Sequence, residues 1–156
     1  MSNYQLELET LQGVLGISGI AVTGWQYQGE YIIRIRVKST HECAVCPECS
    51  QLCSQEHDVG NEQLIRDLPM SSRRCWLIYR PRRFECRVCE RTFVERVSWK
   101  APDLNYTVRY EEHIYARCRR ETVADVAQDE RLSEDVVRNI FERLAKKTLP
   151  HVAIQR

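Results

Sequence analysis

The spacing of apolar residues predicts a helix followed by strands at the start of the chain. Residues 5–15, QLELETLQGVL, carry leucines at intervals that favour a short amphipathic helix. Over residues 31–37, Tyr31, Ile33, Ile35 and Val37 alternate with a second set of side chains, which is the period of a strand. The segment QGE at 28–30 is typical of a turn joining this strand to a preceding one around residues 22–27.

The middle of the chain predicts further strands with arginines along them. Apolar runs flank the turn-prone segment LPMSS, and RCWLIYRPRRF has the aromatic and β-branched residues of a strand. The segment RTFVERVSW predicts another short strand. We expect Trp76, Ile78 and Phe84 to face the core. The neighbouring arginines would then project outward as phosphate contacts: Arg73, Arg74, Arg80, Arg82 and Arg83.

Beyond APDLN the apolar period becomes helical. Three helices are expected in the segments YTVRYEEHIYARCRR, ETVADVAQDE and LSEDVVRNIFERLAKK. Ser133 is the expected N-cap of the last helix, and the basic pair Lys146 and Lys147 suits the opposite end of its dipole.

The last two of these helices have the spacing of a helix-turn-helix. Val126 and Ala127 would pack inside it, and Arg138 and Asn139 would face the major groove, where they could read base edges. Arg131 occupies the turn position that commonly holds Gly, so the turn must adopt another conformation or carry strain. An ordinary three-helix packing unit would show the same apolar pattern.

Charge is distributed unevenly, although the net charge of the 156 residues is only +1. Residues 1–65 carry three basic and eight acidic side chains. Residues 66–120 carry fourteen basic and seven acidic side chains, and residues 121–156 carry six basic and seven acidic ones. The basic middle block indicates a surface that faces an anion, most often nucleic acid, although a solvated face of mixed charge is the alternative.

Cellular location and redox state bear on how the eight cysteines are interpreted. No apolar run approaches the roughly 18 residues that a membrane span needs, and the acidic N-terminus lacks a signal-peptide core. We therefore expect a cytoplasmic protein, in which stable disulfides are rare. Paired cysteines in that compartment are metal ligands or redox groups.

Two C-x-x-C pairs, CPEC and CRVC, predict a metal site. Each pair on a tight turn presents two sulfurs to one ion, and four thiolates satisfy tetrahedral Zn²⁺. The expected ligands are Cys46, Cys49, Cys86 and Cys89, with the 36 residues between the pairs folding as a β-rich insert. The chain is thus expected to be α+β: a β-rich zinc-binding domain over residues 1–102, with an N-terminal helix and hairpin, and a three-helix helix-turn-helix domain over residues 103–150.

Other uses of the cysteines remain open. Cys43 and Cys46 form an overlapping C-x-x-C pair, but Pro47 fixes the turn and favours the Cys46–Cys49 register. An iron–sulfur cluster also takes four thiolates. Redox chemistry needs a βαβ context, which this pattern lacks. The remaining cysteines would be packed or free thiols: Cys43, Cys53, Cys75 and Cys118.

The motifs CPEC, IRDLP and RRFECRVCERTFVE, in this order, resemble the N-terminal zinc-binding domain of the ISL-three family of insertion-sequence transposases. The resemblance extends from about residue 10 to about residue 147. It implies a zinc domain and a helix-turn-helix, which in that family precede a catalytic domain with Asp-Asp-Glu metal ligands. By this resemblance the chain is expected to be a DNA-recognition head without the transposase active site.

Two classes of function follow from these observations. The first is a sequence-specific protein that binds double-stranded DNA, either a truncated transposase or a domesticated remnant acting as a regulator. The second is a protein-interaction adaptor that docks on a larger nucleoprotein complex. No P-loop, nucleophile motif or H-E-x-x-H is present, so we expect no enzyme activity.

Overall fold

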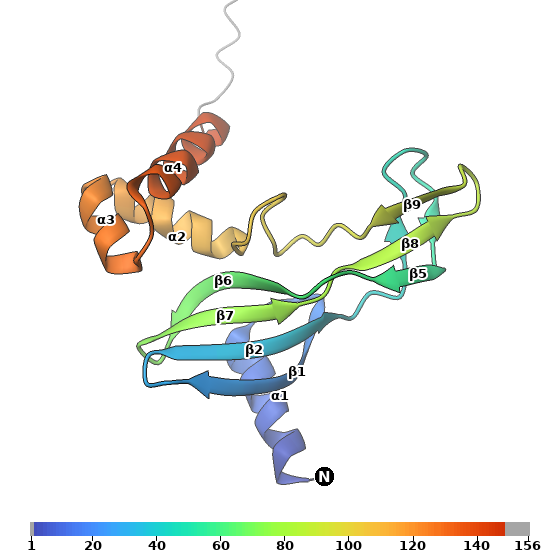
Figure 1. Cartoon of the computed structure of the whole chain (residues 1–156), viewed down its shortest axis with the longest axis horizontal. Helices are drawn as coiled ribbons and strands as arrows, with labels where there is room; N and C mark the ends of the chain where they lie inside the picture. The colour runs from blue at the N-terminus through green and yellow to red at the C-terminus, as the bar shows by residue number, and fades with distance from the viewer. Residues whose placement is uncertain (1, 149–156) are drawn as a thin grey trace, which may run out of the picture. The chain divides into compact units, whose positions relative to one another are not determined.

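The computed structural model describes residues 2–148, and the chain divides into two compact units, one ending at Thr107 and one beginning at Val108 (Figure 1). The first unit contains one helix and nine strands: α1 (Asn3–Leu15), β1 (Ile20–Gln28), β2 (Ile32–Ser39), β3 (Ala44–Val45), β4 (Leu52–Cys53), β5 (Glu56–Val59), β6 (Gln63–Met70), β7 (Arg73–Tyr79), β8 (Arg82–Cys86) and β9 (Arg91–Val94). The second contains α2 (Val108–Cys118), α3 (Val123–Glu130) and α4 (Glu134–Thr148). The expected α+β fold, β-rich first and helical afterwards, is confirmed. The end of the expected second domain at residue 150 lies outside the described residues.

Helix α1 forms where the leucine spacing predicts it. The Ser2 side chain accepts a hydrogen bond from the Gln5 amide, and the helix ends at Gly16, whose φ of 63° favours a residue without Cβ. Leu8 and Leu15 are buried against the sheet.

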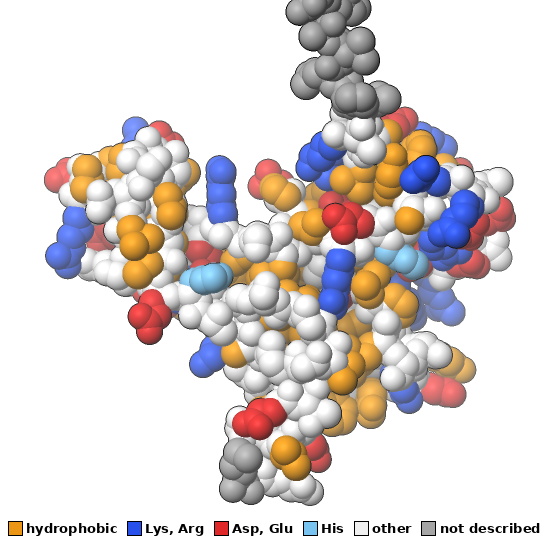
Figure 2. Space-filling view, turned by 180° about the vertical axis from the view of Figure 1, so that it is seen from behind, with side chains coloured by type: hydrophobic (Ala, Val, Ile, Leu, Met, Phe, Trp, Pro, Cys, Tyr) orange, Lys and Arg blue, Asp and Glu red, His pale blue; other side chains and the backbone are white. Residues whose placement is uncertain are grey.

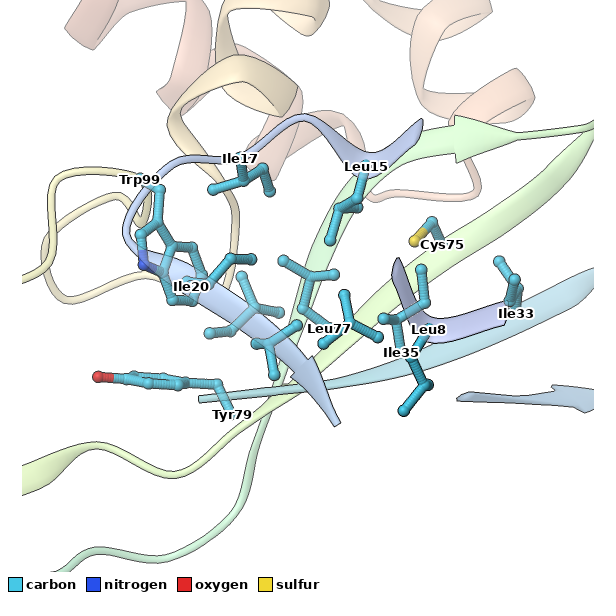
Figure 3. Close-up of a cluster of buried hydrophobic side chains, with 13 residues drawn as sticks. Leu8, Leu15, Ile17, Ile20, Ile33, Ile35, Cys75, Leu77, Tyr79 and Trp99 are labelled. Atoms are coloured by element: carbon cyan, nitrogen blue, oxygen red, sulfur yellow. The ribbon is translucent and has the colours of Figure 1, made fainter. Parts of the chain in front are cut away.

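The main sheet has the strand order β1-β2-β7-β6, in which β2 and β7 are parallel and the other pairs antiparallel. Its core face carries alternate residues of each strand, such as Ile35 and Leu77, which are register partners and fully buried. Figure 3 shows these side chains meeting Leu8, Leu15 and Trp99 in one apolar cluster.

The prediction of one long strand over RCWLIYRPRRF is wrong. Strand β7 ends at Tyr79, and β8 begins at Arg82 in a different sheet, ordered β5-β8-β9. Pro81 lies at the break and has no N–H for a ladder, while its carbonyl accepts a hydrogen bond from the Gly60 amide at 2.7 Å. Phe84 therefore packs in a second, smaller core with Cys46, Cys53 and Cys86.

The three helices of the second unit follow the predicted order. Val126 and Ala127 of α3 and Val137 and Ile140 of α4 are buried, as the apolar pattern indicates. Arg131 adopts the left-handed conformation, with φ 55° and ψ 47°, so the turn keeps a glycine-like geometry at a non-glycine residue. Of the two alternatives for this turn, the structure shows strain and not another conformation.

Candidate metal centre and nucleic-acid interface

Two short turns of matching geometry carry the C-x-x-C pairs. The first joins β3 to β4, where the Cys46 amide donates to the Gln51 carbonyl and the Ser50 amide donates to the Cys46 carbonyl, both at 2.9 Å. The second joins β8 to β9, where Cys86 is the register partner of Arg91. In each turn the residue after the second cysteine is left-handed: Ser50 with φ 60° and Glu90 with φ 54°.

The turns bring four sulfurs into one group. The Sγ atoms of Cys46, Cys49, Cys86 and Cys89 all lie within 4.8 Å of one another. The Cys46–Cys89 and Cys49–Cys86 sulfur separations are 3.6 and 3.5 Å. A tetrahedral Zn²⁺ site with Zn–S bonds of about 2.3 Å has sulfur–sulfur edges of about 3.8 Å, so the spacing fits a four-thiolate zinc site. Of the two possible registers, the structure brings together the Cys46–Cys49 pair.

Backbone amides favour the thiolate form of two of these cysteines. The Cys49 amide lowers the pKa of Cys46, and the Cys89 amide lowers the pKa of Cys86 to about 6. Burial raises the pKa of Cys89 to about 12. A bound cation offsets that effect of burial, because the charge of the metal stabilises all four thiolates together.

The other four cysteines lie outside this group of sulfurs. Cys53 is buried beside it, where burial raises its thiol pKa to about 11 and its sulfur donates to the Gln51 carbonyl. Cys75 lies in the core of the main sheet. Cys43 and Cys118 are half-buried free thiols.

The arginines proposed from the sequence as phosphate contacts have different surroundings. Arg82 bonds Glu95, with Nη2 2.7 Å from Oε2 and Nε 3.1 Å from Oε1, and its Nη2 also donates to the His41 carbonyl. Although burial opposes ionisation of Glu95, its hydrogen bonds from Arg82 and Tyr79 hold the carboxyl pKa below the ordinary value. The Arg82 side chain is 18% exposed, so its guanidinium serves this internal contact.

The remaining strand arginines differ in exposure and partners. Arg83 pairs with Asp58 at 3.2 Å, and both side chains are more than 40% exposed. Arg80 is exposed, and its Nε donates to the Gly60 carbonyl. Arg73 lies over the Tyr27 ring, 4.7 Å from its centroid, and Arg74 is half-buried in β7.

The second turn of α4 exposes the proposed base-reading residues. Arg138 and Asn139 are exposed, while the neighbouring Val137 and Ile140 are buried. The Ser133 hydroxyl accepts a hydrogen bond from the Val136 amide, which confirms the expected cap. The Arg138 guanidinium lies 3.1 Å from Asp135 and 3.7 Å from Glu134.

A buried carboxylate holds the helical unit together. Glu130 accepts hydrogen bonds from Tyr110 at 2.9 Å and from Arg117 at 3.0 Å, and His113 Nε2 lies 3.0 Å from it. No partner for His113 is predicted from the sequence. The helical spacing of residues 110, 113 and 117 could have indicated a shared partner, because it places the three side chains on one face of α2.

Comparison with known families gives two matches. Residues 42–89 match the zinc-finger of transposase IS204/IS1001/IS1096/IS1165, and residues 95–145 match the helix-turn-helix domain of transposase family ISL3. Comparison with curated proteins and with solved structures gave no match. The zinc-finger match contains both C-x-x-C turns, and together with the four-sulfur group it identifies Zn²⁺ as the cofactor. Within the described residues, the helices are all too short or too polar to cross a membrane.

Proposed function

The chain carries the zinc-finger and helix-turn-helix domains of ISL3 transposases, and from this premise we propose that it is a sequence-specific protein that binds double-stranded DNA. The observation that carries the proposal is the exposed pair Arg138 and Asn139 on α4, the last helix within the segment that matches the helix-turn-helix domain. Arg suits the edge of guanine and Asn the edge of adenine in the major groove.

We propose that the zinc site is structural and that its ligands are Cys46, Cys49, Cys86 and Cys89. All four positions of a tetrahedral shell are filled by protein sulfur, which leaves no open position for a substrate. The ion then holds two turns whose apolar support is small, since the surrounding core consists mainly of Cys46, Cys53, Phe84 and Cys86.

The proposed phosphate contacts are the other strand arginines: Arg73, Arg74, Arg80 and Arg83. Such contacts position a protein on DNA without reading sequence. Arg82 belongs to the set expected from the sequence, but we leave it out of the proposal because Glu95 occupies its guanidinium. We further propose that the chain binds DNA without cutting it and acts in the cytoplasm, since the matched domains are a zinc finger and a helix-turn-helix.

The experiment uses the zinc-loaded full chain and a randomised duplex pool. Repeated rounds of binding and amplification select the preferred sequence, and affinities for the selected and the unselected duplex are measured over a range of salt concentrations. A common enriched sequence and an affinity that falls steeply with salt support the proposal, because DNA binding releases counterions. Failure to enrich any sequence, with binding that ignores salt, contradicts it and favours the protein-interaction adaptor.

Catalysis is tested on the selected duplex with Mg²⁺ or Mn²⁺. We expect intact DNA after incubation. Cleavage that co-purifies with the protein and disappears in a point variant would contradict the non-catalytic part of the proposal and leave the DNA-binding part standing.

A further inference from the structure

The main sheet has an apolar core face and a second face on which β2 carries basic side chains. Helix α1 and the core side chains, among them Ile35 and Leu77, lie on the first. Because successive residues of a strand point to opposite sides, the intervening residues of the same strands form the second. We call this second surface the open face. Over β1, β2 and β7 it includes Gln26, Gln28, Ile32, Arg34, Arg36, Lys38, Arg74, Trp76 and Ile78. The expectation that Trp76 and Ile78 face the same core as Leu77 is therefore wrong, although Ile78 is itself buried.

Positive charge on the open face is concentrated along β2. Arg34, Arg36 and Lys38 occupy alternate positions of this strand, and none of the residues named on the open face is acidic. Residues two apart in a strand are separated by about 6.6–6.8 Å, so the three basic side chains form a row roughly 13 Å long. Figure 2 shows the molecule from the side opposite to that of Figure 1, and there basic and acidic side chains are interspersed.

Few carboxylates neutralise this row. Arg36 pairs with Glu62 at 3.2 Å, but both side chains are about half exposed, and such a surface pair is weak and easily exchanged. Within residues 2–148, Arg34 and Lys38 have no carboxylate partner within ion-pair distance. The buried Nε of Arg34 also lacks a hydrogen-bond partner within that range.

We propose that the open face is a second DNA-contacting surface that binds the phosphate backbone of duplex DNA without reading its sequence. The inference rests on the proposed function and adds β2 to the interface. Charge complementarity supports it, since duplex DNA carries one negative charge per about 1.7 Å of its axis and a straight row of cations can neutralise several phosphates. The competing explanation is that the basic side chains only cover the sheet with their apolar stems.

The test compares two double variants of the zinc-loaded full chain. Arg36→Gln with Lys38→Gln removes two exposed charges from β2, and Arg36→Lys with Lys38→Arg keeps both. Each is titrated with an unselected mixed-sequence duplex, with the selected duplex and with a single strand of the same composition, over a range of salt concentrations. Circular dichroism and zinc content establish that both variants fold like the parent chain.

We expect the neutral variant to flatten the slope of log affinity against log salt by about two units on both duplexes, while the charge-conserving variant keeps the parent slope. The preference for the selected over the unselected duplex should not change. If the parent binds DNA and the neutral variant keeps its slope, the open face is not a contact surface and the proposed function still stands. A loss confined to the single strand overturns the assignment to duplex DNA, and a parent chain that binds no DNA overturns both proposals.

Discussion

The guanidinium of Arg82 donates hydrogen bonds to both carboxylate oxygens of Glu95, with Nη2 2.7 Å from Oε2 and Nε 3.1 Å from Oε1. Tyr79 donates to the same carboxylate at 2.6 Å, and the Arg82 Nη2 also donates to the His41 carbonyl. Arg82 thus joins the start of β8 to the end of the main sheet and to the segment that follows β2. It is a structural residue at the junction of the two sheets of the first unit.

We expect Arg82→Ala to lower the free energy of unfolding by about 3 kcal/mol, because Glu95 is almost fully buried and would lose its counter-charge. Arg83→Ala is the matched control one residue along the same strand. Its pair with Asp58 is half exposed, so a loss of less than about 1 kcal/mol is expected. Urea denaturation of both variants with zinc present measures the difference. Equal losses would show that the Arg82–Glu95 contact contributes no more than a surface pair.

The Arg82 contact also shows why some features could be predicted from the sequence and others could not. The C-x-x-C pairs and the helices can be recognised from short segments of the sequence, because ligand spacing and helical period are local. The partnership of Arg82 with Glu95 joins residues 13 positions apart, the first at the start of β8 and the second directly after β9, and nothing in the local pattern marks either side chain as buried. The parallel pairing of β2 with β7 is harder still to predict from the sequence, since four strands, β3 to β6, and the first cysteine turn lie between them.

The single strand predicted over RCWLIYRPRRF shows the same limit. Both halves have strand composition, and only Pro81 marks the break. Composition did not reveal that the chain changes sheets there, so Phe84 was expected in the wrong core.

Zinc removal should unfold one part of the first unit and spare another. The core around Phe84 and the four sulfurs is small, whereas the main sheet has its own cluster around Ile35 and Leu77. On adding a chelator we expect amide hydrogen exchange to accelerate in β3, β4, β8 and β9, with protection retained in β2 and β7.

The ligand assignment is tested by two cysteine variants. Cys89→Ser should abolish stoichiometric zinc in elemental analysis, because it removes one of four thiolates. Cys43→Ser should retain it, since Cys43 lies outside the group of sulfurs. The opposite result would assign the site to the overlapping C-x-x-C pair.

Glu130 should make the stability of the helical unit depend on acid pH. Although burial opposes its ionisation, the hydrogen bonds from His113, Tyr110 and Arg117 hold the Glu130 pKa below its ordinary value of 4.5. A depressed carboxyl pKa contributes stability that is present above pH 4.5 and is lost as the pH falls through the folded-state pKa. We expect Glu130→Gln to cost about 2 kcal/mol near neutral pH and progressively less below pH 4.5.

The measurement is the difference in unfolding free energy between parent and Glu130→Gln at each pH, with zinc present. Acid also protonates the cysteine ligands, but that effect is common to both proteins and cancels in the difference. A difference that stays constant from neutral to acid pH would mean that the charge of Glu130 contributes nothing.

Arg131→Gly should stabilise the helix-turn-helix. Arg131 has φ 55°, a conformation that is strained for a residue with Cβ and free of strain for Gly. The gain is reduced by the greater flexibility of Gly in the unfolded chain, so we expect about 0.5–1 kcal/mol in urea denaturation. Arg131→Ala is the control, because it removes the guanidinium and keeps the Cβ. If both variants shift stability equally, the side chain and not the turn geometry is responsible.

The last prediction concerns the acidic side chains beside the proposed base-reading arginine. In the free protein Arg138 lies 3.1 Å from Asp135, so binding a base edge must exchange that carboxylate for the base. Arg138→Ala should reduce the preference for the selected duplex over the unselected one by about 1–3 kcal/mol, since it removes a base contact. Asp135→Asn should instead strengthen binding to both duplexes, because it releases Arg138 and removes a negative charge close to the phosphates.

Titrations of the two variants at one salt concentration separate the effects. Glu142→Gln is the control for a change in net charge, because Glu142 is an exposed residue two turns beyond Asp135 on α4. If Arg138→Ala leaves the preference unchanged while Asp135→Asn and Glu142→Gln strengthen binding equally, α4 contributes only general electrostatics and the sequence is read elsewhere.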